Sequence, residues 1–215
     1  KELKNQELEN VEKTCFDIES RLRGTSEIKS KNVFATAYLA YLVADNELQS
    51  TKELSNYIEN ELSFEQSLFL KECVGNLWSV VIEIAHDYTV ENLLATILWM
   101  PISNRRSEPN SETPESIVNL ATQILNINNE KVADFCCGVG NFLINAIEQD
   151  KNSKYYGIEI NTHYKEISNI RLNLISDYTE IEQGTVFDLN MDKKFDKIFC
   201  DYPWNILKHN TGINK

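Results

Sequence analysis

Two glycines and two carboxylates in the second half of the chain have the spacing of a nucleoside-binding site. Gly138 and Gly140 lie in the stretch that begins at Asp134, between an expected strand and an expected helix. Glycines there allow a tight turn and a close approach of a ligand to the backbone, and Asp134 can accept a bond from an ammonium group. Glu159 follows about 20 positions later, where a carboxylate can accept both ribose hydroxyls. Leu143 occupies the third glycine position of the dinucleotide fingerprint, which disfavours NAD.

Each of these features also has a purely structural interpretation. The glycine pair alone fits an ordinary turn, and Glu159 fits a solvated acid, although the combination at this spacing favours ribose binding. Asp188 ends an expected third strand at 181–187. It can bond an adenine amino group, with Phe187 or Ile160 packed on the ring. A turn-forming aspartate explains Asp188 equally well.

The four residues Asp201, Tyr202, Pro203 and Trp204 follow the last expected strand and suggest chemistry on an amine. An amine conjugated to a ring is a poor nucleophile, because its lone pair is delocalised. Two acceptors that bond its hydrogens favour a tetrahedral, more nucleophilic nitrogen. The Asp201 side chain and the Tyr202 backbone carbonyl can be these acceptors, and Trp204 offers a flat face for a flipped-out base. A polar turn after a buried strand is the structural alternative.

The elements that position these residues form two expected domains. The pattern of residues 1–102 predicts a bundle of about five helices, because apolar residues recur at helical spacing and no strand-like alternation occurs. Turn-forming residues between positions 101 and 113 mark the boundary. Thr113 is expected to cap the next helix and Pro114 to take its first position. Further on, strands alternate with helices, which predicts a parallel sheet. The expected helices lie at 8–22, 33–43, 48–58, 68–84, 90–100, 114–125, 142–147 and 166–175, and the expected strands at 131–136, 155–160, 181–187 and 195–200.

Charge and cysteine content limit the class of function. The chain of 215 residues has a net charge of −12, which makes it a poor nucleic-acid binder on its own, because phosphate contacts need Lys and Arg. The five cysteines form no Cys-x-x-Cys pair, and three histidines are present, so we expect no metal site. No apolar stretch approaches the roughly 20 residues that a bilayer requires, and no signal pattern begins the chain. We therefore expect a soluble, cytoplasmic protein with reduced thiols and no membrane partner.

In order and spacing, residues 111–205 resemble the methylation (M) subunit of type I restriction-modification systems, which are adenine-specific DNA methyltransferases of the gamma motif order. The resemblance rests on Thr113-Pro114, the glycine loop, the ribose carboxylate, an Asn-rich helix around Asn173 and the tetrapeptide. It implies an α/β fold: an N-terminal all-α domain at 1–102, then a Rossmann-like, S-adenosylmethionine-dependent methyltransferase domain at 111–215 that is incomplete at its C-terminus. It implies that Asp201, Tyr202, Pro203 and Trp204 are catalytic and that the cofactor contacts are Thr113, Pro114, Asp134, Cys136, Gly138, Gly140, Asn141, Glu159, Ile160 and Asp188.

The resemblance also implies an activity and partners. The activity is methylation of the exocyclic amine of adenine in DNA, with S-adenosylmethionine as cofactor and no metal. A separate specificity subunit contacts the DNA sequence and a restriction subunit completes the assembly, so an acidic M subunit is acceptable. Phe135 and Tyr202 stand where the family has Pro, and the chain ends at Lys215 before the family's remaining strands. We expect a fragment or a naturally truncated protein that is itself inactive. The alternatives are a non-catalytic scaffold and a protein-glutamine methyltransferase.

Overall fold

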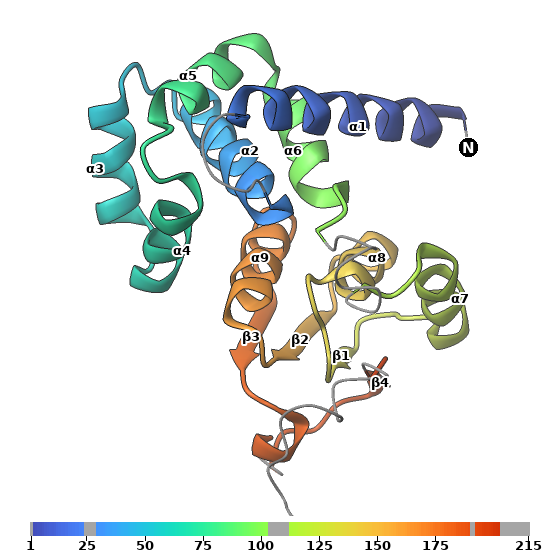
Figure 1. Ribbon diagram of the computed structural model, residues 1–215. Helices are drawn as coiled ribbons and strands as arrows, with labels where there is room; N and C mark the ends of the chain where they lie inside the picture. The colour runs from blue at the N-terminus through green and yellow to red at the C-terminus, as the bar shows by residue number, and fades with distance from the viewer. Residues whose placement is uncertain (1, 24–28, 103–111, 190–191, 203–215) are drawn as a thin grey trace, which may run out of the picture. The chain divides into compact units, whose positions relative to one another are not determined.

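The computed structural model describes residues 2–23, 29–102, 112–189 and 192–202. The chain divides into two compact units, Lys1–Ile102 and Ser103–Lys215. The described part of the first unit is helical, and the second combines a parallel sheet with helices (Figure 1). Among the described residues, no helix is both long and apolar enough to cross a bilayer.

Helix α2 is the centre of the first unit. Its sequence is rich in Ala, Leu and Val and is apolar around most of the helix, and such a helix is stable when it is buried. It contacts every other described helix of the unit. In chain order, the described helices are α1 (Glu2–Leu22), α2 (Ser30–Asp45), α3 (Thr51–Glu61), α4 (Phe64–Val74), α5 (Trp78–Asp87) and α6 (Val90–Trp99).

Short polar side chains begin three of these helices. Ser50, Ser63 and Thr89 each accept a hydrogen bond from the backbone amide three residues ahead, which satisfies a donor that the first helical turn leaves open. The prediction of one helix at 68–84 is wrong, because α4 and α5 are separate helices. Gly75 between them has a φ of +56°, a left-handed conformation that glycine adopts without steric cost.

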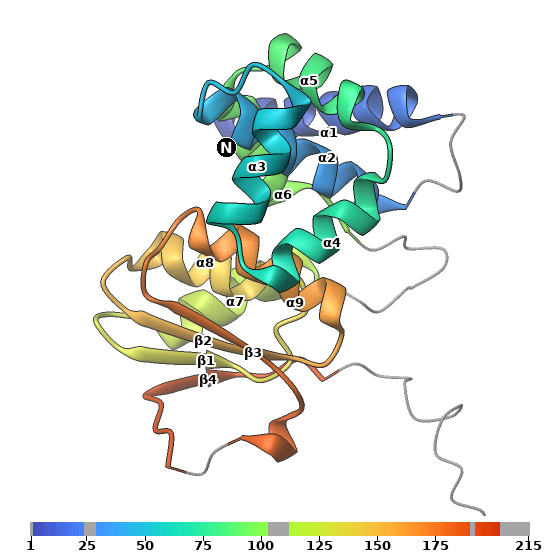
Figure 2. The same cartoon turned by 90° about the vertical axis from the view of Figure 1, so that its left-hand side faces the viewer.

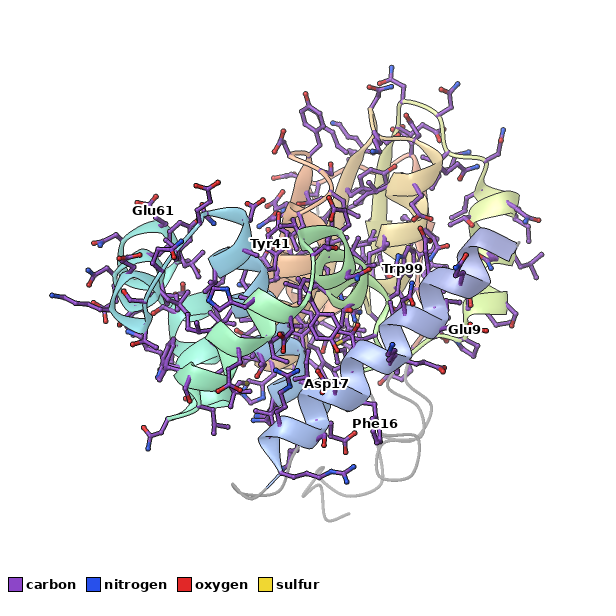
Figure 3. The ribbon with its side chains drawn as sticks, turned by 90° about the horizontal axis from the view of Figure 1, so that it is seen from above. Glu9, Phe16, Asp17, Tyr41, Glu61 and Trp99 are labelled. Carbon is purple, nitrogen blue, oxygen red and sulfur yellow. The ribbon has the colours of Figure 1, made fainter. Side chains whose placement is uncertain are left out.

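A polar network joins α1 to the end of α5. The Arg21 guanidinium pairs with Asp17 at 2.8 Å and with Asp87 at 2.7 Å. The Tyr88 hydroxyl donates to the Asp17 carboxylate at 2.8 Å. Figure 3 shows Asp17 on α1, next to Phe16, whose side chain is 63% exposed. Because the charged groups are partly exposed, the network fixes the position of the two helices more than it stabilises the unit.

The second unit contains a four-stranded parallel sheet with the order β3-β2-β1-β4. Figure 2 shows α7, α8 and α9 on one face of this sheet and the chain that leads from β3 to β4 on the other. Strand β1 lies between β2 and β4, so the strand order reverses beside it, and ligands of open α/β sheets bind at such a point. In chain order, the elements are α7 (Glu115–Leu125), β1 (Lys131–Asp134), α8 (Asn141–Gln149), β2 (Lys154–Glu159), α9 (Thr162–Asn173), β3 (Thr179–Gln183), a 3-10 helix (Val186–Asp188) and β4 (Lys197–Phe199).

Alternation along β2 places its side chains on two faces of the sheet. The Tyr155 hydroxyl donates to the carbonyl of Ala146 in α8 at 2.8 Å, on the helical face. On the other face, the Tyr156 ring stacks on Phe195, with 5.1 Å between ring centroids. A small apolar cluster forms there from Ala133, Phe135, Tyr156, Ile158, Leu189 and Phe195.

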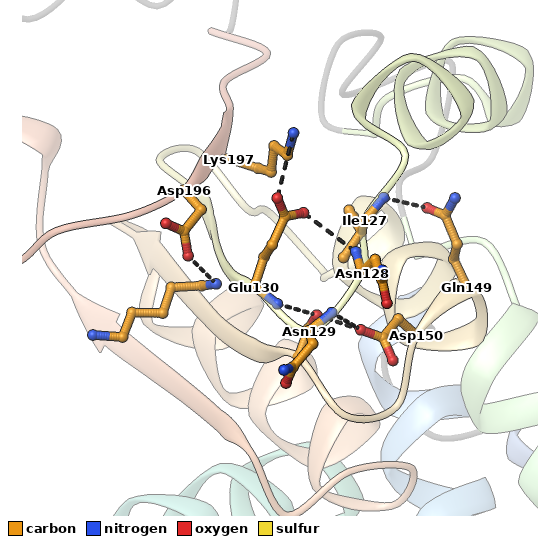
Figure 4. Close-up of polar contacts among 10 residues, drawn as sticks. Ile127, Asn128, Asn129, Glu130, Gln149, Asp150, Asp196 and Lys197 are labelled. Carbon is orange, nitrogen blue, oxygen red and sulfur yellow. Dashed lines mark hydrogen bonds and ion pairs between the residues drawn. The ribbon is translucent and has the colours of Figure 1, made fainter.

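Polar contacts tie the amino edge of the sheet together. The Lys131 backbone amide donates to the Asp196 carboxylate at 2.8 Å, which joins the beginnings of β1 and β4. The Glu130 carboxylate pairs with Lys197 at 3.4 Å. Figure 4 shows the further contacts in which the backbone amides of Ile127, Asn128 and Asn129 donate to Gln149, Glu130 and Asp150. The polar groups named here at the amino edge are therefore paired with one another within the chain.

Three sequence-based expectations for this unit are corrected. Pro114 is the residue before the first helical turn of α7, and Thr113 does not cap that helix. The third strand ends at Gln183, not at 187, because the chain turns at Gly184. Asp188 therefore belongs to a 3-10 helix and does not end a strand. Three apolar side chains of α7 are largely exposed: Ile117, Leu120 and Ile124 are 47%, 53% and 71% exposed.

Candidate active site

The glycine loop runs from the end of β1 to the first turn of α8. Gly138 and Gly140 have φ values of +55° and +88°, which L side chains rarely adopt. The Gly140 amide donates to the carbonyl of Cys137 at 2.8 Å, and the Cys137 amide donates to the carbonyl of Ile158 in β2 at 3.0 Å. The loop thus folds back against the neighbouring strand before α8 begins.

The carboxylate of Glu159 holds this loop from the end of β2. One carboxylate oxygen accepts a hydrogen bond from the Gly138 amide at 2.9 Å, and the other accepts one from the Asn161 amide at 2.7 Å. The side chain is buried, and this burial raises the pKa of Glu159, while the backbone amides oppose the rise. A carboxylate offers about four lone-pair sites, so the same side chain can also accept a ribose hydroxyl.

A buried arginine supports the loop from α9. Arg171 is fully buried, and its guanidinium donates to the carbonyl of Val139 at 3.2 Å and to the side-chain oxygen of Asn141 at 3.3 Å. No motif in the sequence singles out Arg171. Its position four residues after the buried Ile167 is the signal that places it on the inner side of α9.

Two glycines are required where the loop packs on other elements. A Cβ at Gly140 would lie 2.9 Å from the Ser168 hydroxyl oxygen, on α9. A Cβ at Gly157 in β2 would lie 2.7 Å from Ile181 Cδ1 and 2.9 Å from the Cys137 sulfur. Contacts this short force a shift of the neighbouring atoms. The loop therefore depends on close packing with β2 and α9.

Asp134 is the most deeply buried carboxylate of the site, with 2% of its surface exposed. The Cys136 amide donates to its side chain at 3.1 Å. Burial raises the pKa of Asp134 to about 7, and the negative charges of Asp201 and Glu159 add to this rise. A buried carboxylate beside two others favours a bound cation, because a positive charge stabilises its ionised form.

Asp201 lies directly after β4 and has a partner from the beginning of the unit. The Thr113 hydroxyl donates to the Asp201 carboxylate at 2.9 Å. Because β1 and β4 are parallel neighbours, Asp134 and Asp201 both lie at the carboxyl edge of the sheet. This edge therefore brings together the glycine loop, three carboxylates and Thr113.

Large apolar side chains are exposed at the same edge. Ile160 follows β2 and is 64% exposed, and Phe187 lies in the 3-10 helix after β3 and is 90% exposed. Exposed apolar groups next to a polar loop are suited to pack on a flat ring. Whether they flank an adenine stays a prediction.

The remaining expected site residues are placed as follows. Pro114 precedes α7, Tyr202 is exposed, and the Cys136 sulfur lies 3.8 Å from that of Cys200. The backbone of Asp188 lies in the 3-10 helix, and Pro203 and Trp204 lie outside the described residues. Among the described residues, no group of three or more His, Cys, Asp or Glu is placed to hold a metal ion.

Comparison with known proteins gives one family and several structural relatives. Residues 106–215 match the family described as N-6 DNA methylase. A solved structure described as the modification subunit of a type I restriction enzyme, from Vibrio vulnificus YJ016, has a TM-score of 0.55 and 14% identity over 91% of this chain and 60% of that one. This likeness confirms the expected α/β, Rossmann-like fold.

Two further relatives are more distant. A class I S-adenosylmethionine-dependent methyltransferase from Listeria monocytogenes has a TM-score of 0.48 and 16% identity over 78% of this chain and 59% of that one. A tRNA/tmRNA (uracil-C(5))-methyltransferase from Acinetobacter baylyi is 28% identical over 142 residues, which are 56% of this chain and 39% of that protein. The chain thus spans less than two thirds of each of these relatives.

Proposed function

This chain belongs to the N-6 DNA methylase family, and we propose that it takes part in S-adenosylmethionine-dependent methylation of the exocyclic amine of adenine in DNA. The observation that carries the proposal is the position of Asp201 at the same sheet edge as the glycine loop, bonded to Thr113. Asp201, the proposed acceptor for the target amine, and the glycine loop, the proposed binding site of the cofactor, then lie at the same edge, as transfer between two bound molecules requires.

The residues of this edge fit S-adenosylmethionine on three structural grounds. Asp134 is a buried carboxylate with other carboxylates nearby, which suits the positive charges of that molecule. Glu159 keeps lone pairs for the ribose hydroxyls while it holds Gly138. Ile160 and Phe187 expose apolar surface for the adenine ring. The cofactor supplies an electrophilic methyl group when it is bound.

The chain's own residues act on the target amine. The Asp201 carboxylate accepts one hydrogen of the amine, and the backbone carbonyl of Tyr202 accepts the other. These two bonds favour a tetrahedral nitrogen whose lone pair is available for attack, since conjugation with the ring is reduced. Tyr202 lacks the rigid pyrrolidine ring that Pro has at this position in the family, but its backbone carbonyl is retained. The Thr113 hydroxyl, from the beginning of the second unit, orients the Asp201 carboxylate through its hydrogen bond.

We propose that the protein acts within a restriction-modification assembly. The Vibrio protein of similar fold is described as a modification subunit, and the net charge of −12 makes this chain a poor binder of DNA phosphates by itself. A separate specificity subunit would supply the contacts to the DNA sequence, and a restriction subunit would complete the assembly.

The test compares Asp201→Ala with the matched control Asp177→Ala, an exposed carboxylate that precedes β3 and so lies at the amino edge of the sheet, not at the carboxyl edge. Assayed with its partner subunits, the Asp201→Ala protein should lose methyl transfer to DNA, while cofactor affinity falls far less than the rate, since the expected contact of Asp201 is with the target amine. Calorimetry measures the affinity, and transfer of a labelled methyl group measures the rate.

The same assay separates the alternatives. DNA, transfer RNA and a glutamine-containing protein substrate are offered in parallel. Transfer to RNA or to glutamine, without transfer to DNA, would overturn the proposal. Cofactor binding without transfer to any of the three would support a non-catalytic scaffold, which the substitution of Tyr202 for Pro favours.

A further inference from the structure

Two cysteines face one another at the carboxyl edge of the sheet. The Cys136 sulfur, two residues after Asp134, lies 3.8 Å from the sulfur of Cys200, which directly precedes Asp201. The backbones are held in register here, because the Phe135 amide donates to the carbonyl of Phe199 at 3.1 Å. Adjacent strands lie about 5 Å apart, which is within the range of Cα separations of disulfides.

Cys137 is the neighbouring thiol, and it faces the other way. It is buried, and its sulfur lies 4.0 Å from the Ser168 hydroxyl oxygen on α9. The space above Gly157 is also filled by this sulfur. Cys15 and Cys73 belong to the first unit. Within the second unit, Cys136 is therefore the partner in reach of Cys200.

We propose that Cys136 and Cys200 are a reversible oxidation site that forms a disulfide between the segments that directly follow β1 and β4. A peroxide oxidises the exposed Cys200 thiol to a sulfenic acid, and one water is released. The Cys136 sulfur then attacks the Cys200 sulfur, the S–O bond breaks, and the hydroxyl leaves as a second water with the thiol proton. The S–S distance shortens from 3.8 Å to about 2 Å. A dithiol reductant reverses the reaction.

The difference in exposure assigns the order of the two steps. Cys200 is exposed and Cys136 is half-buried, so an oxidant reaches Cys200 first. Burial raises the pKa of Cys136 to about 12, and the neighbouring Cys200 adds to this rise. Cys136 is therefore a poor target for an external oxidant, and its 3.8 Å contact with the Cys200 sulfur is what brings it into reaction with the sulfenic acid.

The disulfide would change the site because its ends adjoin both halves of it. The Cys136 backbone amide donates a hydrogen bond to the Asp134 side chain, and Cys200 directly precedes Asp201 in the sequence. A cross-link would pull the glycine loop and the Asp201 segment toward each other. This consequence rests on the proposed function, whereas formation of the disulfide does not. We expect oxidation to lower cofactor affinity and reduction to restore it.

The experiment treats the purified chain with hydrogen peroxide and maps its peptides by mass spectrometry without reduction. We expect a peptide pair linked through Cys136 and Cys200, which disappears after dithiothreitol. Cys136→Ser and Cys200→Ser each remove it, while Cys15→Ser, the control in the first unit, retains it. Because Cys200 is exposed, its substitution is expected to leave the fold intact, and circular dichroism checks this.

Separate outcomes bear on the two parts of the proposal. Absence of the linked pair in wild type, with Cys200 found as sulfinic or sulfonic acid, would overturn the oxidation site. A linked pair with unchanged affinity for S-adenosylmethionine would overturn its effect on the active site. If neither the reduced nor the oxidised chain binds the cofactor, the proposed function fails, and the linked peptide still decides whether the disulfide forms.

Discussion

The Thr113 hydroxyl donates a 2.9 Å hydrogen bond to the carboxylate of Asp201, a residue 88 positions further along the chain. Thr113 precedes α7 at the beginning of the second unit, and Asp201 follows its last described strand. The bond orients one carboxylate oxygen of Asp201 and leaves the other for a substrate. Thr113 is therefore a candidate positioning residue for the amine acceptor.

Replacing Thr113 with Val removes the hydroxyl and keeps the shape. We expect the rate of methyl transfer, assayed with the partner subunits, to fall by about 10- to 150-fold, since a hydrogen bond to a charged group contributes about 1.5–3 kcal/mol. Cofactor affinity should change little, and Thr113→Ser should restore the rate. Steady-state kinetics with calorimetry separates the two effects. Loss of cofactor affinity at an unchanged rate would instead assign Thr113 to the cofactor.

The raised pKa of Asp134 predicts pH-dependent cofactor binding. With a pKa of about 7, Asp134 is mostly protonated at pH 6 and mostly ionised at pH 8. A cationic ligand prefers the ionised form, so affinity should rise across this range, by at most about tenfold per pH unit. Calorimetry at pH 6, 7 and 8 measures the slope.

Asp134→Asn is the control for this pH dependence. The amino group of the cofactor itself titrates near pH 8, and the variant retains that contribution while it loses the contribution of Asp134. Asp134→Asn should bind more weakly at pH 8 and with a smaller slope. An identical slope in the variant and the wild type would assign the pH dependence to the ligand alone.

The same pKa makes a prediction about folding. Because the pKa of Asp134 is raised from 3.8 to about 7 by folding, the folded state holds its proton more tightly than the unfolded state between these values. The stabilising contribution of protonated Asp134 is thus complete below pH 4 and is lost as the pH rises through 7. Urea unfolding of wild type and Asp134→Asn from pH 4.5 to 7.5 should show a decline in wild type that is smaller in the variant. Equal declines would contradict the burial of this carboxyl.

Glu159→Ala removes both a loop anchor and the expected ribose acceptor. We expect affinity for S-adenosylmethionine to fall by about 10- to 150-fold, the equivalent of 1.5–3 kcal/mol. Glu61→Ala removes an exposed carboxylate from the first unit and should have no effect. Thermal unfolding identifies any general loss of structure. Unchanged affinity in a folded Glu159→Ala protein would exclude Glu159 from the cofactor site.

Arg171→Met tests the support of the loop from α9. The substitution removes the donors to Val139 and Asn141 while it keeps a long buried side chain, so we expect the free energy of unfolding to fall by about 1–3 kcal/mol. Cofactor affinity should fall as well, because the loop loses a fixed contact. Lys154→Met, at an exposed position of β2, is the control. A variant with wild-type stability would show that packing alone holds the loop.

The sequence predicted those features that depend on local pattern. Strands alternate with helices after residue 130, and the glycine loop joins β1 to α8 as its residue types suggest. The apolar run through Gly75 was extended into one helix because periodicity continues across a break that one residue makes. The boundaries of regular elements were thus less predictable than their types.

Contacts between distant residues were not predictable in the same way. Thr113 was expected to cap α7, yet its hydroxyl bonds Asp201, because the sheet brings the two ends of the unit together. Arg171 was overlooked because charged residues on helices are usually solvated. The side-chain oxygen of Asn141 accepts a bond from Arg171, a contact that the sequence pattern does not indicate, and its expected contact with the cofactor stays a prediction. The roles of the site residues in binding and catalysis remain predictions for the experiments above.

The close packing around Gly157 couples the residues that positions 157 and 181 of the sheet can accept. A methyl group there would contact both Ile181 and Cys137. Cys137 belongs to the glycine loop, which is the proposed cofactor-binding loop. A residue larger than glycine at position 157 therefore needs room to be made by the side chains of both Ile181 and Cys137. Among descendants of this protein, positions 157 and 181 should show epistasis, although neither is expected to touch a ligand.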